Sequence, residues 1–341
     1  MYSVDVVASN MAAGTDDDHA GDPVGRLETT VARLEGTEQA VAFASGPSAL
    51  LATVLATVLQ DRPHIVVLRA FGGQLDEALL GSLGAQLTTV TTTAEVAAAV
   101  RDQTGLILVE TPSQPMLRLV DLAELYSIAP GTPILVDNTC PTPIVQQPAR
   151  HGATLVLHRA LHNLAGRRDA AGALVAANET WAGRLRHARA LTGAVLADCA
   201  AVSVLRGFST LALRIRAQQI TAQRVASVLA AHPCVDRVIY PALPGGDPGR
   251  LLGHQMSGPG LVLGFTVASP GMTQRALARL RVLMASDAPG GPVTGIRRVE
   301  GCPDAERMLQ VCVGLESAAD ILRDLDEALL RASREAAATV S

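Results

Sequence analysis

Three short segments of this sequence carry side chains that could do chemistry. Residues 45–49 (SGPSA) form a glycine-containing turn before an apolar helical run, and the N-terminus of such a helix can bind an anion. Asp137 ends the apolar run PILVD, and residues 158–169 (HRALHNLAGRRD) follow the next apolar run. Each segment also has a structural interpretation: the first is a turn, and Asp137 caps the segment that follows it. The two histidines, four residues apart, could share a helix face as metal ligands do, but no third ligand stands at a fixed spacing, which favours a structural role.

The absence of lysine narrows the chemistry that these segments can do. All 28 basic residues of the chain are arginine. Such a chain has no side-chain amine for a Schiff base, and it has no lysine for a phosphate-binding P-loop. The sequence therefore excludes both mechanisms.

Predicted strands and helices alternate along the part of the chain that must position these segments. Apolar runs predict strands at residues 64–69, 86–90, 105–110, 133–137 and 153–158. Amphipathic stretches between several of them predict helices, at residues 74–84, 93–101 and 120–129. Short apolar strands separated by such helices indicate a parallel sheet covered on both faces, where ligands bind at the carboxyl ends of the strands.

The rest of the chain predicts a smaller α+β unit. An arginine-rich helical region at about residues 195–231 is followed by strands at 235–241, 261–267 and 308–315. An amphipathic helix at 318–336 closes the chain.

Composition excludes several classes of partner. The net charge of −4 leaves no dominant basic surface, so we expect no nucleic-acid partner. The longest apolar stretch, around residues 49–59, is too short to span a bilayer, and the N-terminus does not have the pattern of a secretory signal. The five cysteines show no metal or disulfide spacing, which favours a cytoplasmic protein.

Several motifs, taken in order, resemble the Cys/Met-metabolism enzymes, the cystathionine γ-synthase and γ-lyase family of pyridoxal-phosphate (PLP) proteins. The likeness runs from Gly21 to the C-terminus. FASGPSAL resembles the family's SGMAA turn, FGGQ its YGGT, VETPSQP its E-S/T-P-S-N-P, VDNTCPTP its VDNTFATP, and VCVGLES its SVGxE. LRGFSTLALRIR is similar to the family's RGLKTLxLR helix.

The resemblance implies an α/β fold of the PLP-transferase type I (aspartate-aminotransferase-like) class. Its large domain has a mostly parallel seven-stranded sheet, and a smaller α+β domain follows it. We expect an N-terminal arm at residues 1–20, the large domain at 21–232 and the small domain at 233–341. Because the family's cavity lies at a dimer interface, we also expect a homodimer or homotetramer.

The departures from the family pattern fall on its functional positions. The resemblance places His162 where the family has its Schiff-base lysine. Arg159 and Leu161 take the places of the Ser and Thr that hold the PLP phosphate, and Pro47 has no backbone N–H to offer that phosphate. The family's Y-S-R segment, which reaches a neighbouring subunit, falls on residues 17–19 (DDH).

Three further positions are changed and two are kept. Phe71 replaces a ring-stacking Tyr, Gln114 replaces an Asn, and Gln310 replaces the Arg that would bind a substrate carboxylate. Gly46 is retained, as is Asp137, the partner of the pyridinium nitrogen. Without a pyridinium, we expect a buried Asp137 to pair with His162 or an arginine of residues 158–168. The alternative is that it only caps its own turn.

Three functional interpretations follow. In the first, the chain is a repurposed or pseudoenzyme scaffold without normal transsulfuration activity; it forms no covalent aldimine, and its former cofactor cavity is open to a small-molecule ligand. In the second, it is an enzyme that holds PLP or pyridoxamine phosphate non-covalently, with Arg159 on the phosphate and His162 as general base. In the third, it is a non-catalytic partner of an active paralogue.

Overall fold

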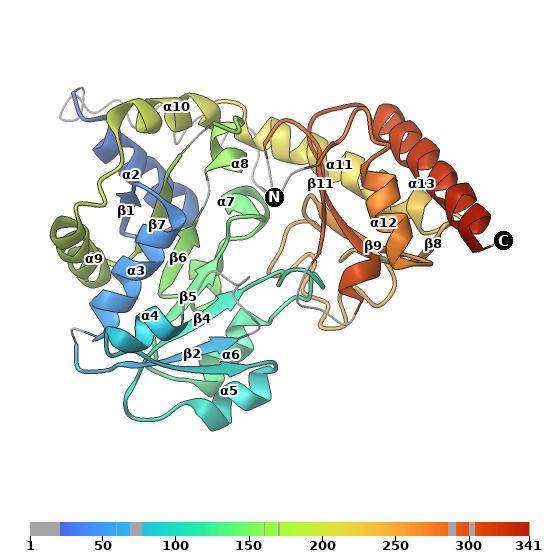
Figure 1. Cartoon of the computed structure of the whole chain (residues 1–341). Coiled ribbons are helices and arrows are strands. Elements are labelled where there is room, and N and C mark those ends of the chain that lie inside the picture. The colour runs from blue at the N-terminus through green and yellow to red at the C-terminus, as the bar shows by residue number, and fades with distance from the viewer. Residues whose placement is uncertain are drawn as a thin grey trace.

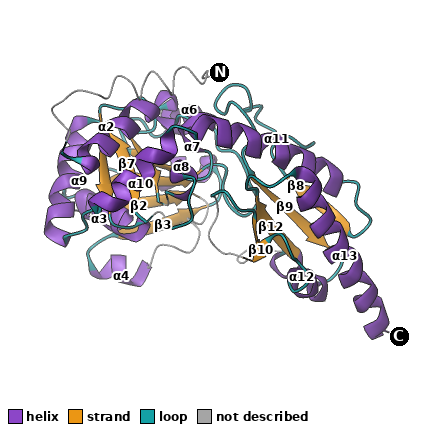
Figure 2. Ribbon diagram, turned by 90° about the horizontal axis from the view of Figure 1, so that it is seen from above, coloured by secondary structure: helices purple, strands orange, loops and turns teal. Residues whose placement is uncertain are grey.

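A computed structural model describes residues 21–58, 60–68, 77–159, 161–169, 171–285, 291–299 and 304–340, without the side chains of 79 and 336–340. The predicted arm at residues 1–20 and the candidate Phe71 therefore lie outside the described residues. The chain forms two sheets joined by a long helix, α11 (Figures 1 and 2). The predicted boundary between residues 232 and 233 stays a prediction.

The first sheet has seven strands in the order β1-β7-β6-β5-β4-β2-β3. Pairing is parallel from β6 through β5, β4 and β2 to β3, and β7 is antiparallel to both of its neighbours. The mostly parallel seven-stranded sheet is thus confirmed. The bounds are β1 (Gln39–Phe43), β2 (His64–Leu68), β3 (Gln86–Val90), β4 (Thr104–Glu110), β5 (Ile134–Asp137), β6 (Leu155–His158) and β7 (Ala173–Ala177).

Helices cover both faces of this sheet, because successive strand residues are apolar and point to opposite sides. In β4, Leu106 and Leu108 pack with α3 and α9, while Ile107 and Val109 pack with α6 on the other face. The helices are α2 (Pro23–Glu35), α3 (Gly46–Val58), α4 (Glu77–Ser82), α5 (Thr93–Ala99), α6 (Leu122–Ile128), α7 (Thr142–Val145), α8 (His162–Ala165) and α9 (Glu179–Thr192). A 3₁₀ turn spans Pro148–His151.

The helical region predicted at residues 195–231 is two helices rather than one. They are α10 (Asp198–Phe208) and α11 (Leu211–Leu229), and the chain bends at Ser209 and Thr210 between them. One face of α10 packs Val204 and Phe208 into the same core as α2, and α11 then runs on toward the second sheet.

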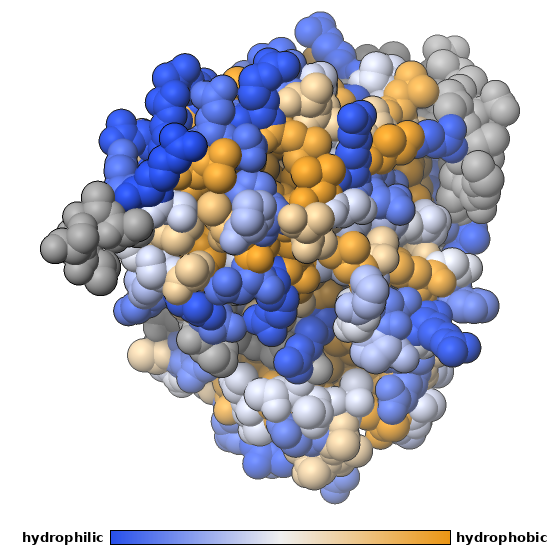
Figure 3. Space-filling model, turned by 90° about the vertical axis from the view of Figure 1, so that its right-hand side faces the viewer, coloured by the Kyte–Doolittle hydropathy of each residue, from blue (hydrophilic) through white to orange (hydrophobic). Residues whose placement is uncertain are grey.

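The second sheet has five strands in the order β10-β11-β12-β9-β8. Only the β10–β11 pair is parallel. The strands are β8 (Val235–Ile239), β9 (Val262–Val267), β10 (Met284–Ala285), β11 (Gly295–Arg298) and β12 (Met308–Cys312), accompanied by α12 (Pro270–Leu277), α13 (Ala318–Val340) and a 3₁₀ turn (Ala305–Arg307). On the side of the molecule that carries this unit, polar and apolar side chains are interspersed (Figure 3).

None of the described helices is both long enough and apolar enough to cross a bilayer.

Candidate functional site

Three neighbouring parallel strands end at the same edge of the first sheet, and each brings a charged residue there. Glu110 ends β4 and Asp137 ends β5, and the register pairs these two residues directly. Arg159 follows the last residue of β6, the next strand. The two carboxylates are 4% and 2% exposed, so the edge holds two buried acids beside one guanidinium.

Arg159 pairs with both carboxylates. Its Nε forms an ion pair with Oδ2 of Asp137, and its Nη2 donates to Oε1 of Glu110 at 3.0 Å. The prediction of an arginine partner for Asp137 is confirmed. Local capping is present as well, because Oδ1 of Asp137 accepts the backbone N–H of Thr139 at 2.9 Å.

This arrangement shifts the pKa values of Glu110 and Arg159. Burial and the nearby Asp137 carboxylate raise the pKa of Glu110 to about 7, against the opposing effects of Arg159 and the Gln114 backbone N–H. Burial disfavours the charged guanidinium, but Asp137 and Glu110 outweigh it and raise the pKa of Arg159. Arg159 therefore stays a cation, while the pKa of Glu110 lies near neutrality.

The turn at residues 45–49 begins α3 and is closed by its own side chains. Ser45 and Ser48 bond reciprocally: the Ser45 N–H donates to Oγ of Ser48, and the Ser48 N–H donates to Oγ of Ser45. Pro47 has no N–H. Of the three residues that begin α3, only Gly46 keeps an N–H with no hydrogen-bond partner in the described structure.

Gly46 also shows how closely this turn approaches Arg159. A Cβ on Gly46 would lie 2.5 Å from the Arg159 carbonyl oxygen and 3.0 Å from its Cβ. Glycine is required because the start of α3 packs against the residue that pairs with Asp137. The Arg159 backbone therefore lies against the start of α3, while its side chain pairs with Asp137 and Glu110.

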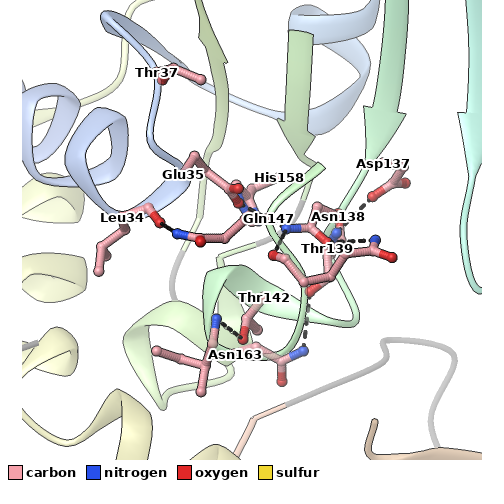
Figure 4. Close-up of polar contacts among 12 residues, drawn as sticks. Leu34, Glu35, Thr37, Asp137, Asn138, Thr139, Thr142, Gln147, His158 and Asn163 are labelled. Atoms are coloured by element: carbon pink, nitrogen blue, oxygen red, sulfur yellow. Dashed lines mark hydrogen bonds and ion pairs between the residues drawn. The ribbon is translucent and has the colours of Figure 1, made fainter. Parts of the chain in front are cut away.

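His158 and His162 do not share a helix face, so the possibility that they form a pair of metal ligands on one helix is wrong. His158 ends β6 and is fully buried, and its Nε2 lies 2.6 Å from Oε1 of Glu35 (Figure 4). His162 begins α8, where its Nδ1 is buried without a hydrogen-bond partner among the described residues. No group of three metal-ligating side chains occurs in the described part of the chain.

Asn163 secures the segment that carries His162. Its amide donates to the Thr139 carbonyl at 3.4 Å, and its oxygen accepts the backbone N–H of Gly291 at 3.0 Å. The Thr139 hydroxyl in turn accepts the Arg159 N–H at 2.9 Å. The ends of β5 and β6 are therefore tied together beside Asp137; Figure 4 shows Asp137, Thr139 and Asn163 of this region.

Gln114 and Gln310, two more predicted positions, meet through an arginine that sequence reasoning missed. Arg297 on β11 donates to Oε1 of Gln310 from Nε and Nη2, at 3.0 and 2.8 Å, and to Oε1 of Gln114 from Nη2 at 2.9 Å. The Gln114 amide donates to Sγ of Cys140 at 3.1 Å. Burial, followed by Cys312 and the nearby carboxylates, raises the pKa of the Cys140 thiol.

The chain is similar over most of its length to proteins of one enzyme family. The chain matches a model described as "Cys/Met metabolism PLP-dependent enzyme" over residues 20–330. An L-methionine gamma-lyase of Brevibacterium sandarakinum is 43% identical over 324 residues, covering 92% of this chain and 82% of that protein. A cystathionine gamma-lyase of Bacillus subtilis (strain 168) is 32% identical, covering 89% of this chain and 85% of that protein.

A solved structure agrees with these matches. The crystal structure of a cystathionine gamma synthase from Xanthomonas oryzae pv. oryzae, in complex with aminoacrylate and cysteine, superposes with a TM-score of 0.88. The two chains are 26% identical, and the match covers 96% of this chain and 98% of that one. The type I fold inferred from the motifs is confirmed.

Proposed function

Because this chain belongs to the Cys/Met metabolism PLP-dependent enzyme family, we propose that it keeps the family's fold and has lost the family's covalent cofactor chemistry. In this proposal it is a repurposed scaffold whose former cofactor cavity binds a small molecule. The ion pair between Arg159 and Asp137 is the observation that carries the proposal.

The residues at this site do not fit the cofactor of the family. The resemblance makes Asp137 the partner of a pyridinium nitrogen, and here Arg159 already supplies a fixed positive charge to that carboxylate. A pyridinium could take this place only by displacing Arg159 from Asp137, and a buried guanidinium that loses its partner is itself destabilised. The absence of lysine removes the covalent bond that would offset this cost.

The phosphate end of the cofactor fits no better. A phosphate takes several charge-assisted hydrogen bonds, each worth roughly 1.5–3 kcal/mol. At the start of α3, Pro47 offers no N–H, and the N–H of Ser48 is bonded to Ser45. Leu161 has no hydroxyl, and Arg159 is paired with two carboxylates, so the Gly46 N–H is the one unbonded donor left at the start of α3 in the described structure.

One observation favours the second interpretation, a lysine-independent PLP enzyme. His162 stands where the resemblance places the lysine, and its Nδ1 is buried without a described partner. An imidazole at this position could act as the base that takes a proton from a ligand. This role requires PLP or pyridoxamine phosphate to bind non-covalently beside His162.

The test is the ultraviolet–visible spectrum of the purified protein, before and after PLP addition and dialysis. We expect a colourless protein that retains neither PLP nor pyridoxamine phosphate. His162→Lys alone is expected not to restore tight binding, whereas His162→Lys combined with Arg159→Ser frees Asp137 and strengthens PLP binding over the single variant. Retention of PLP by the unmodified protein would refute the proposal and favour His162 as a base, and His162→Ala would then abolish turnover with the cofactor still bound.

A further inference from the structure

A cavity of about 170 Å³ lies where the loop between β8 and β9 packs against α7. One wall is formed by residues 143–147 and by the 3₁₀ turn that follows them, and residues 253–257 of the loop form the other. Arg159, Asp137 and Glu110 are not among its described lining residues. The cavity is therefore separate from the charged cluster at the carboxyl edge of the sheet.

Buried hydrogen bonds hold the floor of this cavity in place. The amide of Gln146 donates to the Thr111 carbonyl at 3.1 Å, and its oxygen accepts from the Gln255 amide at 3.0 Å. The backbone N–H of Ser257 donates to the Val145 carbonyl at 2.8 Å. These contacts join the loop to the first unit without any ligand, so binding in the cavity requires little further ordering of the chain.

The lining carries three basic side chains and no acid. Arg150 and His151 come from the 3₁₀ turn, and His254 comes from the loop on the opposite wall. In the described structure neither histidine side chain forms a hydrogen bond. A guanidinium and two imidazoles around one small cavity are the donors that bind an oxyanion.

The charges around His151 leave room for an anion. Burial lowers the pKa of His151; the Asp121 carboxylate opposes this effect, and the Arg150 guanidinium adds to it. The helix α6, which packs against this turn, contributes Asp121 at its start and the ionisable side chains Glu124 and Tyr126. The Asp121 carboxylate accepts the Glu124 N–H at 3.0 Å and does not line the cavity. An anion beside Arg150 would offset the guanidinium charge and favour protonation of His151.

Size and charge limit the ligand. The cavity is smaller than the roughly 300–1,000 Å³ of sites for drug-sized molecules, and it has room for about ten water-sized groups. A phosphate group carries about −1.5 to −2 charges at neutral pH and has several acceptor oxygens. It can use the guanidinium and both imidazoles at once, whereas a monocarboxylate has two oxygens and one charge.

We propose that Arg150, His151 and His254 bind a phosphate group, either free or at the end of a small phosphate monoester. The three residues take part as binding residues, and no chemical step on the ligand is implied. The proposal is independent of the proposed function, because the cavity does not include Asp137, Arg159 or Glu110.

The test uses isothermal titration of the full chain with inorganic phosphate, glycerol phosphate and acetate. We expect phosphate to bind and acetate to bind at least tenfold more weakly; the tighter of the two phosphate ligands identifies the source of the group. Arg150→Gln should weaken phosphate about 10- to 100-fold. Arg250→Gln is the matched control, since it removes an exposed arginine of the same loop that does not line the cavity, and it should bind like the unmodified protein. His254→Gln tests the opposite wall and should also weaken phosphate.

A second measurement follows the histidines through pH. Sulfate stays a dianion between pH 6 and 8, so a change in its affinity reports the protein alone. We expect sulfate to bind more tightly at pH 6 than at pH 8, because protonated imidazoles bind the anion better. The double variant His151→Gln/His254→Gln should lose this dependence. Absence of phosphate and sulfate binding, equal affinity in the Arg150 and Arg250 variants, or an unchanged pH dependence in the double variant would each overturn the proposal.

Discussion

Glu110 is the residue whose charge state ties this site to pH. Its folded pKa of about 7 lies above its ordinary value of 4.5 because of burial and the adjacent Asp137. Between these two values the folded protein holds a proton that the unfolded chain releases, so stability falls as pH rises through 7. The full difference amounts to about 3 kcal/mol.

Glu110→Gln should remove this dependence. The amide keeps an oxygen acceptor for Arg159 and carries no charge. We expect the variant to be more stable than the unmodified protein at pH 8, with a flatter curve of unfolding free energy between pH 5 and 8, measured by urea denaturation. A parallel experiment on Glu327→Gln, a solvated residue of α13, should reproduce the unmodified curve; an unchanged slope in Glu110→Gln would contradict the assignment.

Arg159 is expected to be the arginine whose loss destabilises the site most. Arg159→Met leaves two adjacent buried carboxylates without their cation, which should cost about 3–5 kcal/mol at pH 8. The loss should shrink at pH 5, where Glu110 is protonated. Thermal melts at both pH values test this. Arg167→Met, which removes an exposed pair with Asp169, serves as the control and should leave the melting temperature unchanged.

At the scale of elements, the start of α3 depends on its contact with the end of β6. Gly46→Ala puts a Cβ 2.5 Å from the Arg159 carbonyl oxygen, and such overpacking costs about 1–3 kcal/mol. Gly183→Ala in α9 is the matched control: its Cβ meets nothing within 4 Å, so the gain in helix propensity should stabilise by roughly 0.5–1 kcal/mol. We expect the denaturation midpoint to fall in Gly46→Ala and to rise in Gly183→Ala. An unchanged midpoint in Gly46→Ala would refute the close contact between Gly46 and Arg159.

The elements also show what sequence could predict and where it stopped. Two apolar runs that end in acids, GLILVE and PILVD, predict that Glu110 and Asp137 both lie at the carboxyl edge of a parallel sheet, although only Asp137 was singled out. The strand order and register then place the two side by side. The strands β1 and β7 were missed because QAVAF and ALVAA are short and alanine-rich, without a period that separates strand from helix. Arg297 was missed because its partner Gln310 is set by the β11–β12 register, which no local pattern encodes.

At the scale of the whole molecule, we expect at least a homodimer. Large apolar side chains are exposed on α11, with Leu213 at 54% and Ile220 at 67%, seven residues apart and so on one helix face. These two side chains are candidates for the contact with a second subunit, because their burial there would remove apolar surface from water. Sedimentation equilibrium should give at least twice the monomer mass of 35.4 kDa, and Ile220→Asp should weaken the association; a monomer at micromolar concentration would contradict the prediction.

The hydrogen bond from Arg297 to Gln114 joins a strand of the second sheet to a loop of the first. The two sheets are thus joined at this hydrogen bond as well as through α11, so a rotation of one sheet against the other must break the contact between Arg297 and Gln114.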